Sequence, residues 1–250
     1  MSLVIVTGAS KGFGRAVALA YSSRFPGSDF VLLARDAAGL STTRDLLLSA
    51  GARHVDVFPF DLSNVAGLGA RLKDLLPPAA AGVTKAVLVN NAGSLGDLSR
   101  TLEEYDVDEM AAYVNFNVTS AAVLTTVFLR AYSAVPERLV VNISSLLAVQ
   151  AHSHWGMYAV GKAARDMLHA AVAVEGKDKG IRTVNYAPGP LVGDMQQYIR
   201  GAIGDGKQRE IYTSLHEQGQ LVPMEKSAEK LIALIADNKF ESGAHCDYYD

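Results

Sequence analysis

Residues 3–14 read Leu3-Val4-Ile5-Val6-Thr7-Gly8-Ala9-Ser10-Lys11-Gly12-Phe13-Gly14, a short apolar run that leads into a glycine-rich turn. The β-branched run predicts a buried strand, and the glycines permit a tight turn with close backbone approach before a helix. A helix that begins there offers unpaired N–H groups to a pyrophosphate. The spacing is G-x-x-x-G-x-G rather than G-x-G-x-x-G, so the strand and helix context carries the interpretation.

Similar β-branched runs recur along the chain and alternate with longer segments of helical period. The predicted strands cover residues 3–7, 30–34, 54–58, 85–90, 139–143, 181–185 and 244–248. The predicted helices cover residues 14–24, 39–50, 65–76, 108–133, 157–176 and 225–238. Near-continuous apolar strands separated by helices are typical of a parallel sheet covered on both faces. We therefore expect an α/β fold, a single doubly wound Rossmann-type domain over residues 1–250 with a seven-stranded parallel sheet.

Composition narrows the function classes. The 250 residues are 49% hydrophobic and carry a formal net charge of -3, which gives no long-range attraction to nucleic acid or anionic membranes. A single cysteine, Cys246, excludes an intrachain disulfide framework, and no basic leader or apolar stretch of about 20 residues is apparent. We expect a cytoplasmic protein with no nucleic-acid or membrane partner.

The residues after the second and third predicted strands bear on the choice of cofactor. Ala34-Arg35-Asp36 offers both an arginine, which accepts a 2'-phosphate, and a carboxylate, which binds a ribose hydroxyl. Lys11 in the glycine turn supplies a second cation and Asp36 can cap a helix, so the sequence favours NADPH over NADH. Asp61-Leu62 follows the third strand and is placed either to contact the adenine or, for Asp61, to cap a helix.

A phenol and an ammonium share one helix face in Tyr158-Ala159-Val160-Gly161-Lys162. A cation four residues from a phenol can stabilise the phenolate and lower a pKa that is otherwise about 10. Taken alone, such a pair is more typical of a solvated helix surface than of a catalytic site. Ser144-Ser145, at the end of an apolar run thirteen residues upstream, makes the interpretation as a tuned proton donor stronger.

The glycine turn, Asn90-Asn91-Ala92-Gly93, Ser145 and Tyr158-x-x-x-Lys162 follow one another in an order that resembles the short-chain dehydrogenase/reductase family. The resemblance implies that Tyr158 is the general acid, that Lys162 binds the nicotinamide ribose and lowers the pKa of Tyr158, and that Ser145, rather than Ser144, binds the carbonyl oxygen. Asn117 matches the asparagine that holds a water beside the lysine, with Asn115 as its rival and a plain buried amide as the alternative for either.

The same resemblance implies a set of cofactor-binding residues. The implied set is Gly8, Ser10, Lys11, Gly12, Phe13, Gly14, Arg35, Asp36, Asp61, Leu62, Asn90, Ala92, Gly93, Lys162, Pro188, Leu191, Val192, Gly193, Asp194, Met195 and Gln196. The segment 188–219 is glycine-rich and lies between the sixth and seventh strands, so it is either a substrate lid or a structural excursion.

Further segments resemble those family members that reduce the side-chain carbonyl of a pterin. They are residues 93–97, 161–168, 185–191, 194–197 and 242–250. The resemblance implies that Asp247 pairs with the aminopyrimidine end of the pterin, against the alternative of a surface aspartate. Trp155 is expected either to line the substrate pocket or to pack in the core, and Gly189 is expected at the substrate side.

The sequence is also compatible with other functions, and it bears on metal binding and on oligomeric state. The catalytic residues would equally serve a reductase of non-pterin dicarbonyls or aromatic ketones, and a non-catalytic NADPH-binding protein is a further alternative. His152 and His154 lack further ligands at useful spacing, so we expect no metal site. The predicted helices 108–133 and 157–176 are apolar on more than one side, which favours a homodimer.

Overall fold

The computed structural model describes residues 1–250 and contains one parallel sheet in the order β3-β2-β1-β4-β5-β6-β7. The strands are β1 (Ser2–Thr7), β2 (Asp29–Ala34), β3 (His54–Pro59), β4 (Lys85–Asn90), β5 (Glu137–Ile143), β6 (Ile181–Ala187) and β7 (His245–Asp247). Strand β1 pairs with β2 on one side and β4 on the other, so the chain reverses direction across the sheet there. In sheets of this kind, ligands bind beyond the carboxyl ends of the strands at such a reversal.

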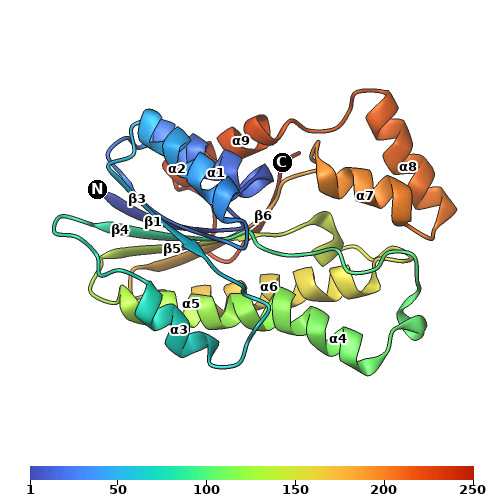
Figure 1. Ribbon diagram of the computed structural model, residues 1–250, viewed down its shortest axis with the longest axis horizontal. Coiled ribbons are helices and arrows are strands. Elements are labelled where there is room, and N and C mark those ends of the chain that lie inside the picture. The colour runs from blue at the N-terminus through green and yellow to red at the C-terminus, as the bar shows by residue number, and fades with distance from the viewer.

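Helices cover both faces of the sheet (Figure 1). One layer holds α1 (Gly12–Arg24), α2 (Ala37–Ser49) and α9 (Met224–Asp237), and the other holds α3 (Leu68–Leu75), α4 (Val107–Val114), α5 (Ser120–Ala131) and α6 (Gly156–Glu175). A π-helical stretch, Asn115–Thr119, joins α4 to α5. Helices α7 (Asp194–Ala202) and α8 (Gly206–Glu217) project together from one end of the sheet. Short 3-10 turns cover Leu102–Glu104 and Leu146–Ala148.

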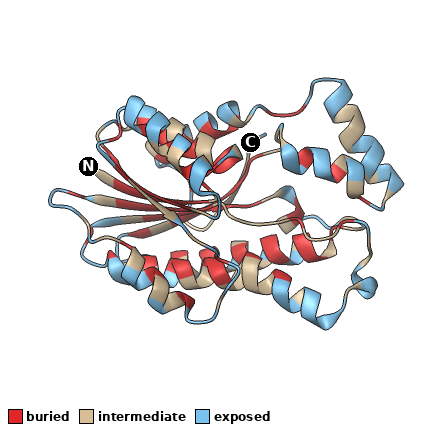
Figure 2. Cartoon of the chain, in the orientation of Figure 1, coloured by how far each residue is buried: buried red, intermediate tan, exposed pale blue.

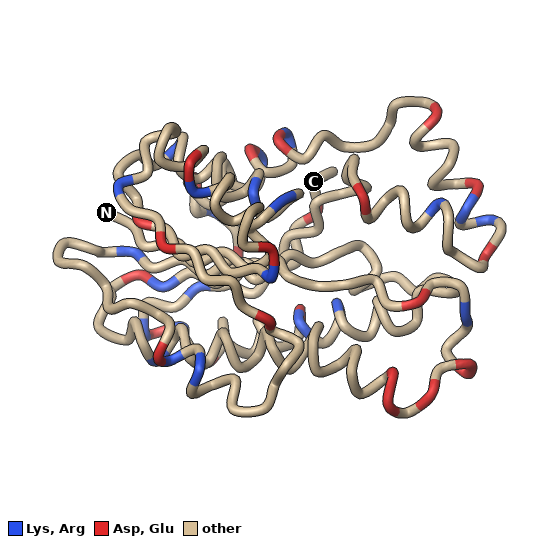
Figure 3. The backbone as a smooth tube through the Cα atoms, in the orientation of Figure 1, with Lys and Arg blue, Asp and Glu red and all other residues tan.

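Two apolar cores lie between the sheet and its helical layers. Side chains alternate across a strand, so Val4 and Val6 face the core beneath α1 and α9, whereas Leu3 and Ile5 face the core beneath α3 and α5. Figure 2 shows the result, with buried residues along the strands and on the inner helix faces. Acidic and basic residues are interspersed over both helical layers (Figure 3).

The fold predicted from the sequence is confirmed, including all seven strands. Two differences from the predicted helices have local reasons. Helix α3 begins at Leu68 rather than residue 65 because Gly67 adopts a left-handed conformation, with φ of 61°. Residues 188–219, expected as loosely structured pieces, contain α7 and α8.

The sequence predicted no apolar stretch long enough to cross a membrane, but one helical segment meets that length and hydropathy. Val107–Ala131 is a helical segment whose length and mean hydropathy of 1.3 would allow it to cross a membrane. Its inner face packs on the sheet through Leu124 and Phe128, which are fully buried, as in a core helix of a globular fold.

Candidate active site

A cavity of about 1870 Å³ opens beyond the carboxyl ends of the strands, with residues of α7 and α8 along one side. It is lined by residues from the glycine turn, from the segments that follow β2 to β6, and from the C-terminal segment. Most of the predicted site residues meet there: Gly8, Ser10, Lys11, Gly12, Phe13, Arg35, Asp36, Asp61, Leu62, Ala92, Gly93, Ser145, Trp155, Tyr158, Lys162, Pro188, Gly189, Leu191, Gly193, Asp194, Met195, Gln196 and Asp247.

Four predicted residues do not line the cavity. Gly14 lies behind the turn, Val192 is half exposed, and Asn117 is buried in the π-helical stretch. The side chain of Asn90 points into the fold, where its Nδ2 donates to Thr125 Oγ1 at 2.9 Å. The neighbouring Asn91 lines the cavity instead, because consecutive residues at a strand end face opposite sides.

The glycine turn has the geometry of a phosphate cradle. Gly8 and Gly12 adopt φ values of 64° and 60°, which favour glycine. A Cβ on Gly14 would lie 2.4 Å from the Gly8 carbonyl oxygen, so only glycine lets α1 begin this close to β1. No side chain caps the first turn of α1, which leaves its N–H groups free for an anion. These residues therefore fit the pyrophosphate of a dinucleotide.

The polar groups around the adenosine end divide into free and engaged side chains. The Asp36 carboxylate accepts from Gly39 N at 3.1 Å and caps α2, and Asp61 Oδ1 accepts from Ser63 N at 2.9 Å, so both carboxylates are engaged in local turns. Lys11 Nζ contacts Asp194 Oδ2 at 2.5 Å across the mouth of the cavity. Arg35 makes no hydrogen bond and lines the cavity, which leaves its guanidinium available to a phosphate.

Tyr158 and Lys162 stand together on the first half of α6. Lys162 Nζ donates to the Ile143 carbonyl oxygen at 2.7 Å and lies 5.4 Å from the centroid of the Tyr158 ring. Burial raises the pKa of Tyr158 to about 12, although a hydrogen bond with Ser145 opposes the shift. Burial, with the nearby charge of Arg165, lowers the pKa of Lys162 to about 7. The expected lowering of the tyrosine pKa by the lysine is therefore wrong for this structure, in which desolvation determines the direction of the shift and the opposing contributions come from Ser145 and Arg165.

Asn117 supports the interpretation as a buried amide. Its Oδ1 accepts from Ser94 N at 2.7 Å, and its Nδ2 donates to Ser94 Oγ at 3.1 Å and to the Tyr113 carbonyl oxygen at 3.1 Å. The side chain thereby fixes the loop after β4, whose residues Ser94, Leu95 and Gly96 line the cavity. Its amide is occupied by protein partners rather than directed at Lys162.

Tyr113 of α4 fits between two glycines at the edge of the cavity. A Cβ on Gly96 would lie 3.2 Å from the Tyr113 ring, and a Cβ on Gly161 would lie 3.0 Å from it. The Tyr113 hydroxyl donates to the Ser94 carbonyl oxygen at 3.2 Å. Gly161, the residue before Lys162, therefore leaves room for Tyr113, which supports the cavity wall formed by Ser94 and Gly96.

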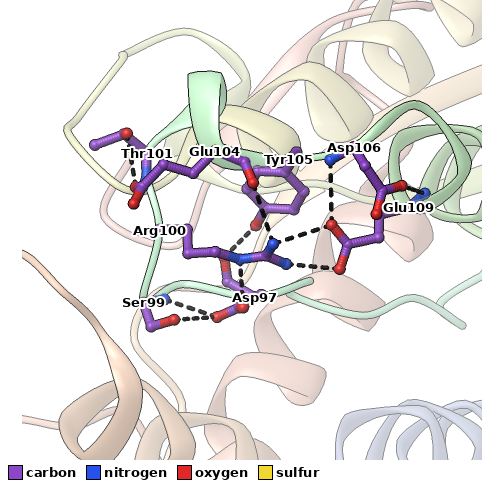
Figure 4. Close-up of polar contacts among 8 residues, drawn as sticks. All are labelled: Asp97, Ser99, Arg100, Thr101, Glu104, Tyr105, Asp106 and Glu109. Atoms are coloured by element: carbon purple, nitrogen blue, oxygen red, sulfur yellow. Dashed lines mark hydrogen bonds and ion pairs between the residues drawn. The ribbon is translucent and has the colours of Figure 1, made fainter.

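The same wall is held from outside by Arg100, which sequence reasoning missed (Figure 4). Its Nε donates to Asp97 Oδ2 at 2.7 Å, its Nη2 donates to Glu109 Oε1 at 2.8 Å, and its guanidinium lies 4.6 Å from the centroid of the Tyr105 ring. These contacts tie residues 97–109 into one folded loop beside the cavity. A single arginine within an acidic segment is the only signal the sequence offers.

Arg165 is the second residue that sequence reasoning missed. It lies on α6 three residues after Lys162 and is 1% exposed. Its Nε donates to Asn142 Oδ1 at 2.7 Å, its Nη1 donates to the Ala92 carbonyl oxygen at 3.0 Å, and its Nη2 bonds to the Asn90 carbonyl oxygen. A permanent cation is thus fixed beneath the catalytic pair and the cofactor wall. The available signal was an arginine three residues after Lys162 and therefore on the same helix face as the catalytic pair.

Two residues expected on the substrate side differ in their surroundings. Trp155 is 1% exposed and packs against Tyr158 and Tyr212, with ring centroids 5.6 and 5.7 Å away, so core packing dominates although part of its surface reaches the cavity. Asp247 is placed by β7, where it pairs in register with Ala187. Its Oδ1 accepts from Tyr249 N at 3.0 Å, so one carboxylate oxygen is engaged in a local turn, and the residue lines the cavity.

A family described as short chain dehydrogenase matches residues 2–203. The chain belongs to this family. Among its relatives, the sepiapterin reductase of Bos taurus is 40% identical over 100% of this chain and 95% of its own length. A benzil reductase of Bacillus subtilis, which forms (S)-benzoin, is 28% identical over 94% of this chain and 93% of its own length. As a short-chain dehydrogenase, the chain is an oxidoreductase that uses a nicotinamide cofactor.

Solved structures share the fold of this short-chain dehydrogenase. A short-chain dehydrogenase/reductase from Saccharomyces cerevisiae superposes with a TM-score of 0.84 at 24% identity, covering 100% of this chain and 97% of the other. A structure from Beutenbergia cavernae, described as an NAD(P)-dependent gluconate 5-dehydrogenase with bound NADP at low occupancy, superposes with a TM-score of 0.81. It is 25% identical and covers 98% of this chain and 94% of that chain.

Proposed function

We propose that this short-chain dehydrogenase uses NADPH to reduce the side-chain carbonyl of a pterin, such as sepiapterin or 6-pyruvoyl-tetrahydropterin, in tetrahydrobiopterin synthesis. The observation that carries the proposal is the meeting of Tyr158, Ser145 and Asp247 in one cavity with the glycine turn. An acid for the reacting carbonyl and a carboxylate for the aminopyrimidine then lie in the same enclosure. The sepiapterin reductases at up to 40% identity over the full chain support the same substrate class.

Three residues of the chain have separate roles in the proposed reduction. A bound NADPH supplies the hydride. Tyr158 keeps its proton at neutral pH, because burial raises the pKa of its phenol to about 12, and delivers that proton to the carbonyl oxygen. Ser145 donates a hydrogen bond to the same oxygen as negative charge develops. Lys162, held on the Ile143 carbonyl, would bind the nicotinamide ribose.

The preference for NADPH rests on two cations at the adenosine end. Arg35 is unpaired in the cavity, and Lys11 of the glycine turn lines the same cavity. A guanidinium recognises a phosphate with two parallel hydrogen bonds, whereas the nearby carboxylate of Asp36 is already engaged as a helix cap. We propose that Arg35 holds the 2'-phosphate and that Lys11 exchanges Asp194 for it.

The decisive experiment compares Asp247→Ala with wild type on two substrates, sepiapterin and benzil, by following the loss of NADPH absorbance. Loss of a charged partner at the aminopyrimidine should lower kcat/KM for sepiapterin at least about tenfold and leave benzil reduction nearly unchanged. Asp237→Ala, an exposed aspartate on α9, is the matched control. Equal losses on both substrates would contradict the pterin assignment.

A reductase of non-pterin dicarbonyls is the second candidate, because the Bacillus subtilis benzil reductase is also similar over nearly the whole chain. It predicts faster turnover of benzil than of sepiapterin by wild type, with no effect of Asp247→Ala. If the pure protein binds NADPH but oxidises it with neither substrate, a non-catalytic nucleotide-binding role would replace both candidates.

We also propose a homodimer that acts in the cytoplasm as one domain. Val160, Met167 and Val174 are 49%, 71% and 79% exposed and stand seven residues apart on α6, so they form an apolar stripe that a second subunit would cover. Met167→Glu should convert the dimer to monomer in light scattering. We further propose that residues 188–219 close over bound substrate, which should appear as slower hydrogen exchange in α7 and α8 when NADPH and substrate are present.

A further inference from the structure

A carboxylate on α6 joins the sheet to the C-terminal segment. Asp166 Oδ1 accepts from Asn142 Nδ2 at 2.9 Å, and its Oδ2 contacts His245 Nδ1 at 2.7 Å. Asn142 also accepts from the buried Arg165 and donates to Asn185 Oδ1 at 3.0 Å. The network therefore runs from the cation beneath the catalytic pair to the first residue of β7.

Strand β7 is the shortest strand of the sheet and has a neighbour on one side only. It comprises only His245–Asp247, at the edge of the sheet, and pairs with β6 through three residues. Its flanks are held by Asn185 N, which donates to the Ala244 carbonyl oxygen at 2.9 Å, by Tyr248 N, which donates to the Ala187 carbonyl oxygen at 2.8 Å, and by Lys230 Nζ, which donates to the Tyr248 carbonyl oxygen at 2.6 Å. The contact of His245 with Asp166 is the one ion pair between α6 and this C-terminal segment. Two residues later in the same strand, Asp247 lines the cavity.

The environment of His245 favours its charged form. From α6 it faces Asp166, from the C-terminal segment it faces Asp247 and Asp250, and from β6 its neighbour in register is the uncharged Asn185. The hydrogen bond with Asp166, together with the carboxylates, raises the pKa of His245 above its ordinary value of 6.5, although burial opposes the shift. The ion pair with Asp166 is thus present while His245 is protonated and is lost as the pH rises through that raised pKa.

We propose that Asp166 and His245 are positioning residues for substrate binding, and that the protonated pair holds β7 so that Asp247 faces the substrate. This inference rests on the proposed function, since it assigns Asp247 to substrate recognition. When the proton leaves His245, the charge-assisted contact becomes a neutral hydrogen bond. The edge strand then loosens, and substrate affinity falls while the chemical step is retained.

The kinetic test uses His245→Gln and Asp166→Asn, with His54→Gln as the matched control. His54 also pairs with an aspartate, Asp56, at 2.9 Å, but on β3 at the opposite edge of the sheet. In wild type, KM for sepiapterin should rise as the pH increases above 6.5, the ordinary pKa of histidine, and His245 loses its proton, with kcat following a separate profile. Both variants should show KM raised about tenfold and nearly independent of pH, whereas the control should behave as wild type.

A second measurement keeps this inference separate from the proposed function. Hydrogen exchange of residues 244–250 in the full chain, corrected for intrinsic rates, needs no substrate. Exchange should accelerate with pH in wild type and should be fast at every pH in His245→Gln. Identical exchange in wild type and His245→Gln, or a loss confined to kcat with KM unchanged, would overturn the positioning role. Failure of wild type to reduce sepiapterin, with exchange as expected, would overturn only the proposed function.

Discussion

Arg165→Met removes the three hydrogen-bond donors that this arginine directs at the Asn90 and Ala92 carbonyl oxygens and at Asn142 Oδ1. Each acceptor left buried and unpaired costs about 1 to 3 kcal/mol. Part of that loss is offset, because burying the uncharged methionine side chain avoids the free-energy cost of desolvating a guanidinium. We therefore expect the free energy of unfolding to fall by about 3 kcal/mol, a large share of the roughly 5 to 15 kcal/mol typical of a domain.

Urea denaturation followed by circular dichroism measures the loss, with Lys226→Met, which replaces an exposed cation on α9, as the control. The control should lie within about 0.5 kcal/mol of wild type. Arg165→Lys should be almost as damaging as methionine, since one ammonium cannot reach all three acceptors in the plane of a guanidinium. A methionine variant as stable as wild type would refute the view that this cation holds the ends of β4 and β5 together.

Three further outcomes follow from the site. Gly14→Ala should abolish cofactor binding in a fluorescence titration, because its Cβ would lie 2.4 Å from the Gly8 carbonyl oxygen; binding within twofold of wild type would contradict the close packing. Arg35→Ala should raise KM for NADPH by about tenfold and leave KM for NADH nearly unchanged, and an equal effect on both would show that Arg35 does not read the phosphate. The free energy of unfolding should rise with pH from about 7 toward 10, because the pKa of Lys162 is lowered to about 7 and the unfolded chain then binds more protons; Lys162→Met should flatten this rise.

The sequence predicted the sheet well because its strands are buried on both faces, and a run such as Val87-Leu88-Val89 leaves little choice of structure. It predicted α7 and α8 poorly, since glycines at positions 201, 204 and 206 interrupt the helical pattern. Asn91 lines the cavity where Asn90 was predicted, because side chains alternate between the two faces of a strand. This alternation predicts which of two neighbours faces the cavity only when the last residue of the strand is known.

The residues around the catalytic pair were harder to find than the pair itself. Tyr158 and Lys162 share one helix face and can be read from local spacing. Arg165 and Asp166 act through Asn142 on β5 and His245 on β7, which are distant in the chain and become neighbours only after the sheet forms. The pKa of Tyr158 was also mispredicted, because it is raised by burial, and burial depends on the whole fold.

The position of Tyr113 between Gly96 and Gly161 bears on how relatives of this chain can diverge. A methyl group at either glycine would press on the phenol ring, and the smaller side chain needed at 113 to admit it would give up the bond to Ser94. Substitutions at these three positions are therefore not independent, and their energetic effects should be non-additive. In an aligned set of sequences, the residues at positions 96, 113 and 161 should therefore covary.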